Sequence, residues 1–488
     1  MPRLSQSLLP QTAIAKPVYD RAALTTGIVH FGVGGFHRAH QAVYLDDLMN
    51  GGKAQGWGIC GVGLLGGDSA MRDALVPQDC LYTVMTRDAE GDRARVVGSM
   101  TRYLLAPDSP ELVVAMLAAP QTRLVTLTIT EGGYNTDFHA GEFNLSHPDV
   151  VHDLAHPGKP VSAFGYLAEG LARRREAGLA PFTVLSCDNI QGNGTATANC
   201  MQAFAAARDP QLARWIAQNA AFPNCMVDRI TPQTTEAECA LVQNEFGIDD
   251  AWPVVCEPYR QWVIEDTFCS GRPPLPDVGA QMVADVQPYE TMKLRLLNAG
   301  HSALGYLGWL AGFRTIDRVA SDPQFQSFLR GLWTDEVTPL LPPVPGVDLD
   351  EYKASLLTRF ANPRIADQVA RICGDGSSKM PKFLLPSLHK QLAQNGPHRA
   401  LTLATAGWLR YLSGTGEQGQ PYPIDDPQAA LLQERAVEGG TDPRPLLSVR
   451  SIFGDLIDNH AFVQELGSVL ELLYRQGARA ALAAHLSQ

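Results

Sequence analysis

The chain has 488 residues, of which 45% are hydrophobic and 18% charged, and its formal net charge is −12 at pH 7. This length predicts more than one domain, each able to bury its own core. Lys and Arg do not cluster and no apolar run approaches about 20 residues, which argues against a nucleic-acid surface and against a membrane span.

The first 20 residues lack the continuous apolar core of a secretory signal, because Pro10 and Pro17 interrupt them. We therefore expect a cytoplasmic protein. The nine cysteines are scattered along the chain and include no Cys-x-x-Cys pair, which predicts reduced thiols rather than disulfides.

A glycine-rich segment follows the first apolar run. Residues 27–31 form that run, and residues 32–41 read GVGGFHRAHQ before a helical pattern begins. Gly32 would permit a tight turn, and Gly34 would let the backbone approach a pyrophosphate at the helix N-terminus. His37 stands where the third glycine of this fingerprint is expected, so the motif departs from the full pattern. The predicted cofactor-binding residues of this segment are Gly32, Gly34, Gly35, Phe36, His37 and Arg38.

A second apolar run, residues 56–65, leads to Gly-Gly-Asp at positions 66–68. An acid after the second strand can bind the ribose hydroxyls of NAD, but Asp68 could equally cap the helix that starts at Ser69. Proteins that bind NADP usually supply Arg or Lys here, and the nearest is Arg72, a turn into the helix. We therefore expect NAD as the cofactor.

Polar side chains follow three further predicted strands. Residues 123–130 lead into Glu131, residues 182–187 lead into Asp188 and Asn189, and residues 225–232 repeat the scheme with Asp228 and Arg229. Residues 81–97 are expected to form a β-hairpin. In open parallel sheets, ligands bind at the carboxyl ends of strands, so these side chains are candidates for a binding site. A plain surface turn is the alternative for the segment around Glu131.

Three prolines at positions 273, 274 and 276 end this pattern, and from about Pro288 onward almost every periodic stretch is helical. The helices predicted there include residues 386–394, 399–412 and 461–485. The predicted fold is α/β. Residues 1–285 would form a Rossmann-like, mostly parallel dinucleotide-binding domain, and residues 286–488 a mostly α-helical substrate domain.

The helix predicted at residues 289–304 places four polar side chains on one face. At about 100° per residue, Lys293, Asn298 and His301 fall within an arc of about 140°, which also contains Glu290. The helix is apolar nearly all round, so its polar groups are expected to face an internal cavity. The alternative is an ordinary ion pair between Glu290 and Lys293, with the other two side chains satisfied in the core.

Five segments in order, GVGGFHRAHQ, TLTITEGGYN, SCDNIQGNG, MVDRITP and KLRLLNAGH, resemble the long-chain polyol-specific dehydrogenases, the family of mannitol 2-dehydrogenase. The resemblance covers roughly residues 27–475. It implies a metal-independent oxidoreductase with a nicotinamide cofactor on the Rossmann domain and a polyol or ketose substrate held against the helical domain. We expect a monomer or a small homo-oligomer with small-molecule partners only.

The resemblance also implies individual roles. Lys293 would be the general base, Asn189 and Asn298 would hold the alcohol oxygen, and His301 would bind a substrate hydroxyl. Burial disfavours a charged ammonium, and amide donors stabilise the alkoxide that forms transiently. The remaining candidates are the polyol contacts Asp228, Arg371 and Lys379 and the proton relay Glu290 and Glu131.

Several alternatives share these features. Within the family they are oxidation of sorbitol or D-arabinitol and reduction of fructuronate or tagaturonate, although TEGGYN is more similar to the polyol oxidisers. A non-catalytic nucleotide-binding module is a rival from another class. A zinc-dependent polyol dehydrogenase would need clustered Cys, His and Glu ligands, which the sequence does not offer, so no metal is expected. The predicted reaction is NAD-dependent oxidation of a mannitol-type hexitol to fructose.

Overall fold

The computed structural model describes residues 3–137 and 142–487. Its internal contacts divide the chain into two compact units, Met1–Gln287 and Pro288–Gln488, and each unit is described here by itself. Among the described residues, no helix combines the length and the apolar composition needed to cross a membrane.

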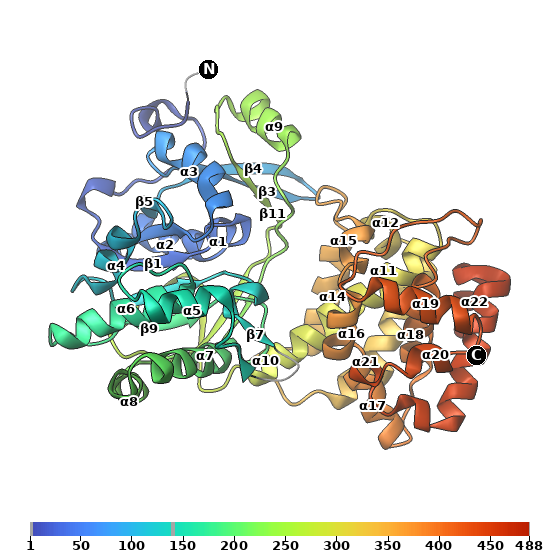
Figure 1. The fold of residues 1–488 in the computed structure, drawn as a ribbon. Coiled ribbons are helices and arrows are strands. Elements are labelled where there is room, and N and C mark those ends of the chain that lie inside the picture. The colour runs from blue at the N-terminus through green and yellow to red at the C-terminus, as the bar shows by residue number, and fades with distance from the viewer. Residues whose placement is uncertain (1–2, 138–141, 488) are drawn as a thin grey trace. The chain divides into compact units, whose positions relative to one another are not determined.

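The first unit is built on a five-stranded sheet in which every neighbouring pair of strands is parallel (Figure 1). The strand order is β5-β2-β1-β6-β9, so the chain leaves the centre in both directions, as in a doubly wound fold. This confirms the predicted Rossmann-like architecture. The strands are β1 (Thr26–Phe31), β2 (Gly58–Gly63), β5 (Met100–Leu105), β6 (Leu124–Leu127) and β9 (Thr183–Ser186).

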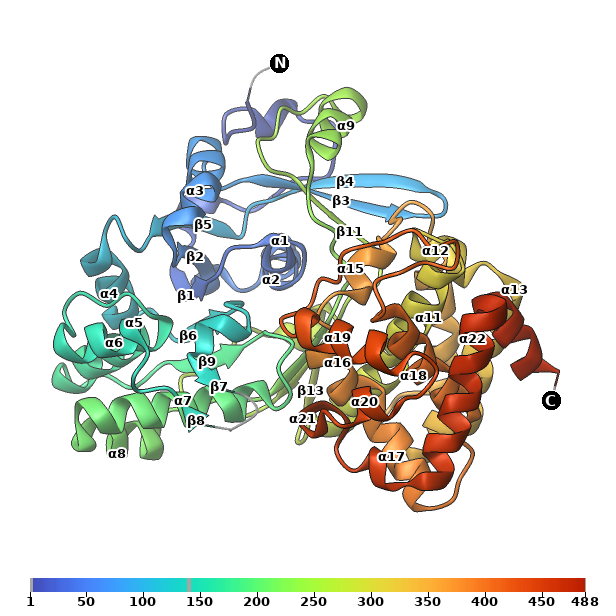
Figure 2. The ribbon, with the colours of Figure 1, turned by 45° about the vertical axis from the view of Figure 1, so that its right-hand side comes forward.

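Successive residues of the central strand face opposite sides of this sheet. Ile28 packs in a core with α2, whereas Val29 packs in a second core with α4 and α6. Figure 2 shows α1 and α2 on one side of the sheet and α4, α5 and α6 on the other. The helices of this unit are α1 (Gly35–Ala39), α2 (Gln41–Asn50), α3 (Ser69–Leu75), α4 (Pro110–Ala118), α5 (Pro148–Ala155), α6 (Ala163–Glu176), α7 (Asn193–Arg208), α8 (Pro210–Asn219) and α9 (Glu236–Phe246).

The predicted hairpin is confirmed, because β3 pairs with β4 in antiparallel register. The strand at Cys225–Asp228 differs from the prediction: it pairs antiparallel with β12 in a separate sheet, and does not extend the parallel one. A short apolar run does not reveal which sheet it joins. The strands outside the main sheet are β3 (Tyr82–Asp88), β4 (Gly91–Val97), β7 (Thr136–Asp137), β8 (Glu142–Phe143), β10 (Cys225–Asp228), β11 (Val254–Cys256), β12 (Gln261–Glu265) and β13 (Gln281–Val283).

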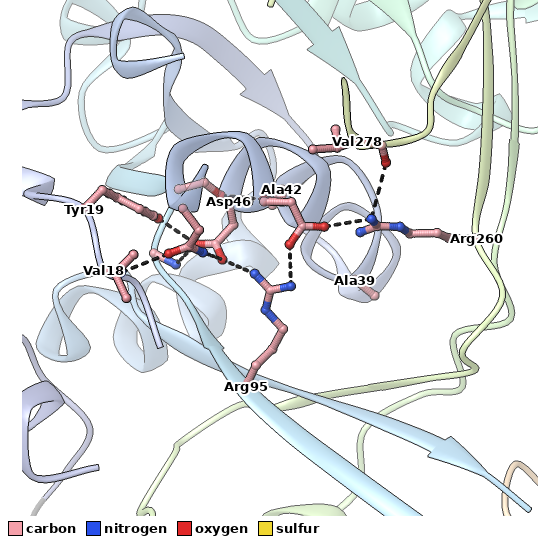
Figure 3. Close-up of polar contacts among 12 residues, drawn as sticks. Val18, Tyr19, Ala39, Ala42, Asp46, Arg95, Arg260 and Val278 are labelled. Atoms are coloured by element: carbon pink, nitrogen blue, oxygen red, sulfur yellow. Dashed lines mark hydrogen bonds and ion pairs between the residues drawn. The ribbon is translucent and has the colours of Figure 1, made fainter. Parts of the chain in front are cut away.

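An ionic network fixes helix α2, which follows the glycine-rich turn (Figure 3). The carboxylate of Asp46 is fully buried and accepts hydrogen bonds from the hydroxyl of Tyr19, at 2.6 Å, and from the guanidinium of Arg95. Arg95 also pairs with Asp47, which in turn binds Arg260 at 2.7 Å. Burial raises the pKa of Asp46, and the arginine beside it opposes that rise. The network thus ties α2 to β4 and to the segment before β12.

The second unit contains helices and, among its described residues, no strand. Helix α11 packs against α15 and α18, and α18 packs against α22. The helices predicted near residues 386–394, 399–412 and 461–485 are α17, α18 and α22. The helices are α10 (Gln287–Met292), which begins at the unit boundary, α11 (Ala299–Leu310), α12 (Ile316–Ala320), α13 (Pro323–Gly331), α14 (Leu349–Phe360), α15 (Val369–Cys373), α16 (Gly376–Phe383), α17 (Leu385–Ala393), α18 (Arg399–Tyr411), α19 (Ala429–Gly439), α20 (Arg444–Leu447), α21 (Arg450–Phe453) and α22 (His460–Leu486).

Candidate functional site

The glycine-rich turn packs directly against the end of β6. Gly32 has a φ of +90°, and a Cβ atom there would lie 2.0 Å from the carbonyl oxygen of Thr128. The hydroxyl of Thr128 donates to the carbonyl of Gly32 at 2.7 Å. Both the backbone conformation and the lack of space therefore require glycine at position 32.

A cavity of about 430 Å³ lies at the carboxyl ends of β1, β2 and β6 and is called the strand-end cavity below. Its volume and its position are those typical of a ligand site in an open parallel sheet. Two predicted cofactor residues, Gly32 and Asp68, line it. The other lining residues are Leu64, Leu65, Thr128, Ile129, Thr130, Gly132, Gly133, Asn135, His147, Asp149, Val161, Ser162 and Ala163.

The side chain of Asp68 makes no cap hydrogen bond to α3, so the capping alternative that the sequence offers is wrong. One carboxylate oxygen accepts a hydrogen bond from the backbone N–H of Leu65 at 2.9 Å, which closes the turn before α3. Asp68 still lines the strand-end cavity. Arg72, on the following helix α3, is ion-paired with Asp73 at 2.8 Å and with Asp108 at 2.5 Å. It is therefore already engaged by two carboxylates.

The side chains of His37 and Arg38 point into the interior, where each is 1% exposed. His37 stacks on His30 with ring centroids 3.3 Å apart, and burial lowers the pKa of both rings, that of His30 to about 3. The Arg38 guanidinium donates to the carbonyl of Trp252 and lies over the ring of Tyr82. Because both side chains are buried, only the backbone amides of His37 and Arg38 are left for the predicted cofactor role. Phe36 is half-buried and Gly34 is exposed.

Asp188 connects the end of β9 with the segment that follows β6. Its carboxylate is 8% exposed and accepts hydrogen bonds from the N–H of Thr130 at 2.8 Å, the N–H of Ile129 at 3.3 Å and the hydroxyl of Tyr134 at 2.9 Å. Thr130 has φ +60° and ψ 173°, a region that is essentially restricted to glycine. Such a conformation costs about 1–3 kcal/mol. The predicted site residue Asn189 follows Asp188 directly and is exposed.

Glu131 opens the short helical turn Glu131–Tyr134 and is exposed. It lines a second cavity of about 690 Å³, called the turn cavity below. The other lining residues are Gly132, Asn135, Thr136, Glu142, Phe143, Asn144, Leu145, Ser146 and His147.

The predicted polyol contact Asp228 closes β10 and is 4% exposed. Its neighbour Arg229 donates to the carbonyl of Glu257 at 3.0 Å and to the carbonyl of Ala39 at 2.5 Å. Arg229 therefore links the end of β10 to the end of α1. This contact explains why the arginine is buried rather than offered to a ligand.

In the second unit, the helix that carries the predicted base differs from the expected continuous α-helix. Residues Lys293–Asn298 form a π-helical turn between α10 and α11. A π-helix pairs backbone groups five residues apart, and Lys293 and Asn298 are five residues apart. The wider turn brings these two positions to nearly the same side of the helix, whereas an ideal α-helix would separate them by about 140°. Lys293 is 7% exposed.

Trp333 supports this π-helical turn. Its indole N–H donates to the carbonyl oxygen of Leu296, inside the turn, at 2.9 Å. Trp333 is fully buried and lies on a second π-helical segment, Leu332–Val337. Gly300 makes room for it, since a Cβ atom at that position would lie 2.9 Å from Cζ2 of the indole. π-helical turns are rare and frequently occur at functional sites.

Asn298 and His301 complete the polar face of this helix. The side-chain oxygen of Asn298 is buried and accepts no hydrogen bond from the described part of the chain. Buried polar atoms normally have a partner, so this oxygen marks a place for a ligand or water. The ring of His301 stacks on Phe360, with centroids 3.9 Å apart and planes at 27°.

The two predicted polyol contacts beyond this helix lie on α15 and α16. The ammonium of Lys379 donates to the carbonyl of Gly374 at 2.6 Å, and burial lowers its pKa. Arg371 is ion-paired with Asp367, one helical turn before it. Arg295, from the π-helical turn, donates to the carbonyl of Phe383 at 2.9 Å. This bond ties the helix of Lys293 to the end of the helix that carries Lys379.

The sequence does not reveal the residues that support these predicted side chains. Trp333 and Phe360 are distant in sequence from the residues they contact, and no motif marks either of them. The sequence offers Asp188 as a binding-site candidate at a strand end and gives no sign of its contacts with the segment after β6. Across residues 3–137 and 142–487, no group of three or more His, Cys, Asp or Glu side chains could hold a metal ion.

Comparison with known proteins gives matches along almost the whole chain. Residues 26–277 match the family described as the mannitol dehydrogenase Rossmann domain, and residues 285–474 match the mannitol dehydrogenase C-terminal domain. A mannitol 2-dehydrogenase of Phaeosphaeria nodorum is 50% identical over 483 residues, which are 98% of this chain and 84% of that protein.

Two solved structures are similar over their full length. The Pseudomonas fluorescens mannitol 2-dehydrogenase, in a ternary complex with NAD and D-mannitol, has a TM-score of 0.91 and 44% identity, and the match covers 100% of both chains. A D-sorbitol dehydrogenase in substrate-free form has a TM-score of 0.90 and 36% identity, and the match covers 98% of this chain and 100% of the other.

Proposed function

The chain belongs to the mannitol dehydrogenase family, and from this membership we propose that it oxidises D-mannitol to fructose with NAD as the hydride acceptor. The observation that carries this proposal is the full-length match, at 44% identity, to a mannitol 2-dehydrogenase whose structure contains NAD and D-mannitol. The enzyme works without a metal ion in this proposal.

The first unit fits the cofactor. Gly32 permits the tight turn after β1, and Gly34 is exposed and leaves room for a pyrophosphate beside the backbone. Asp68 lines the strand-end cavity, and one of its carboxylate oxygens accepts the N–H of Leu65. The ion-paired Arg72 favours NAD over NADP, because its charge is already balanced. When bound, NAD accepts the hydride from the carbon that bears the reacting hydroxyl.

Side chains of this protein bind the oxygen of the reacting hydroxyl and accept its proton. Lys293, as a neutral amine, takes the hydroxyl proton while the amide N–H groups of Asn189 and Asn298 donate to the oxygen. Loss of hydride from the same carbon then leaves the carbonyl of the ketose. The proposed supporting residues are His301, Asp228, Arg371 and Lys379, which hold other hydroxyls, and Glu290 and Glu131, which pass the proton to solvent.

A substrate panel tests the proposal. We expect kcat/KM to be largest for D-mannitol with NAD and for fructose with NADH, and smaller for D-arabinitol and for fructuronate with either cofactor. A larger kcat/KM with NADP than with NAD would contradict the cofactor assignment.

D-sorbitol oxidation is the second candidate function. The likeness to a D-sorbitol dehydrogenase, at 36% identity and a TM-score of 0.90, favours it over other polyols. Mannitol and sorbitol differ in the configuration of one hydroxyl, so a direct comparison of the two substrates decides between them. A kcat/KM that is higher for D-sorbitol would replace the first proposal.

A further inference from the structure

We propose that Asp188 is a positioning residue, which holds the segment 129–135 in the strained conformation that forms the wall of both the strand-end cavity and the turn cavity. Its effect on catalysis rests on the function proposed above. The set of hydrogen bonds from Asp188 to this segment, called the clamp below, can be tested without turnover. Asp188 contacts neither cavity as a lining residue and acts through the backbone of its neighbours.

The carboxylate of Asp188 binds the segment 129–135 near both of its ends. One carboxylate oxygen of Asp188 accepts the N–H of Thr130 at 2.8 Å. The other accepts the N–H of Ile129 at 3.3 Å and the hydroxyl of Tyr134 at 2.9 Å. Tyr134 is fully buried, and its oxygen also lies 2.6 Å from the hydroxyl of Ser186, on β9. The segment is thereby fastened to the end of β9 before and after its turn.

The backbone of Thr130 needs such a clamp. A β-branched residue at φ +60° and ψ 173° occupies a region that is essentially restricted to glycine. Conformations of this kind persist only where the surroundings fix them, and they cluster at functional sites. The bond from the N–H of Thr130 to Asp188 is the fixing contact.

Both cavities depend on this segment. Ile129, Thr130 and Gly133 line the strand-end cavity, Glu131 lines the turn cavity, and Gly132 lines both. The fold of the segment is tight, because a Cβ atom on Gly133 would lie 2.8 Å from the side chain of Ile129. Relaxation at Thr130 would therefore move Glu131 and the shared wall together.

The experiment combines substitutions of Asp188 and Thr130 in the full-length chain. Asp188→Asn replaces one acceptor oxygen with an N–H donor that faces the backbone N–H groups. Hydrogen exchange in peptides that cover residues 129–135 should become faster, on the order of tenfold, since a buried N–H then loses its acceptor. Unchanged exchange in this segment overturns the proposal.

Substitution of Thr130 by glycine should reverse the effect of Asp188→Asn on hydrogen exchange. Glycine adopts the observed backbone angles readily, so Thr130→Gly should recover much of the protection that Asp188→Asn loses. Thr130→Ala removes the same hydroxyl and methyl group but keeps the Cβ atom, and it should recover nothing. If Asp188→Asn shows the same exchange at residues 129–135 with Gly as with Ala at position 130, Asp188 does not act on backbone strain, and the proposal is overturned.

Asp250→Asn is the matched control. Asp250 is a buried carboxylate of the same unit that also binds two backbone N–H groups, of Thr83 and Trp252, and one side chain, Gln78. It lines neither cavity. Its substitution should lower stability while leaving exchange at residues 129–135 and NADH affinity unchanged. A similar effect of both variants would mean that the loss is general destabilisation.

NADH titration and kinetics supply the functional measurement. Asp188→Asn should raise the Kd for NADH and lower kcat/KM by on the order of tenfold. Faster exchange with unchanged Kd and kcat/KM overturns the positioning role. If the wild type oxidises no polyol, the proposed function fails, yet exchange and NADH titration still decide the clamp. If Asp188→Asn does not fold, Tyr134→Phe, which removes only the hydroxyl donor, replaces it with the same expected direction.

Discussion

At the scale of single residues, the proposed chemistry concentrates on Lys293, which is 7% exposed on a π-helical turn. A buried amine without its proton can act as a base, and its protonated form can act as the acid in the reverse reaction. Its position five residues before Asn298 places a proton acceptor and an amide donor on the same side of one helix.

Lys293→Ala should therefore lower kcat by about 10²–10⁴ both in polyol oxidation and in ketose reduction. Wild-type oxidation should rise with pH as the amine loses its proton, and this limb should flatten in the variant. Lys353→Ala is the control, since Lys353 is equally buried at 8% exposed, forms an ion pair with Asp350 at 2.7 Å and has no part in the proposed chemistry. A variant at position 293 with a wild-type pH profile would place the base elsewhere.

Asn298 offers a second prediction at this scale. Asn298→Ala should lower kcat by about 10²–10³, because an oxyanion donor is lost, while NADH affinity stays nearly constant. Asn298→Asp keeps the shape but replaces the N–H donor with an acceptor, so it should be no more active than the alanine variant. Steady-state kinetics and fluorescence titration of NADH measure both effects. Wild-type turnover in the aspartate variant would remove the donor role.

At the scale of elements, the π-helical turn is maintained by tertiary contacts and not by its own sequence. Leu, Met, Lys and Arg favour an α-helix through this stretch, as the sequence predicts. The indole of Trp333 nevertheless binds the carbonyl of Leu296, and Gly300 leaves the space that this indole occupies. The register between Lys293 and Asn298 therefore depends on a residue of another element.

Trp333→Phe should reduce kcat about tenfold with little change in KM, because a carbonyl inside the turn loses its donor at a cost of ~1–3 kcal/mol. Trp262→Phe provides the control: its indole nitrogen has no hydrogen-bond partner in the described part of the chain. Both variants should lose thermal stability through lost packing, which a melting curve measures. An equal fall of kcat in both would show that the bond to Leu296 has no special role.

At the scale of the whole molecule, each unit has its own core and its own part of the proposed chemistry. The first carries the strand-end cavity, the turn cavity, Asn189 and Asp228, and the second carries the π-helical turn with Lys293, Asn298 and His301. Substitutions of Lys293 or Asn298, in the second unit, should therefore lower turnover and leave NADH affinity nearly unchanged.

The complete chain should also retain its activity after treatment with a chelator. No cluster of metal-ligating side chains occurs within residues 3–137 and 142–487, and the proposed mechanism assigns the proton to an amine and the oxygen to amide donors. Dialysis against EDTA followed by assay with D-mannitol and NAD is the measurement. Loss of turnover that zinc alone restores would contradict a metal-free mechanism.

Local patterns in the sequence predict much of the architecture. Apolar runs ending in glycine or in polar residues identified β1, β6 and β9, and the period of the later segments identified α17, α18 and α22. Five ordered motifs identified the family. These features are local, so residue order alone expresses them.

Tertiary structure alone decided what depends on residues that are distant in sequence. The sequence assigned Cys225–Asp228 to the scheme of the parallel strands, but its partner is the antiparallel strand β12. It predicted a continuous α-helix through Lys293, but packing against Trp333 supports a π-helical turn. It offered Asp188 as a binding-site candidate at a strand end, whereas the carboxylate accepts the N–H of Thr130 and holds this residue in a glycine-like conformation. Each of these outcomes depends on a contact between separate elements, whose energy no local pattern records.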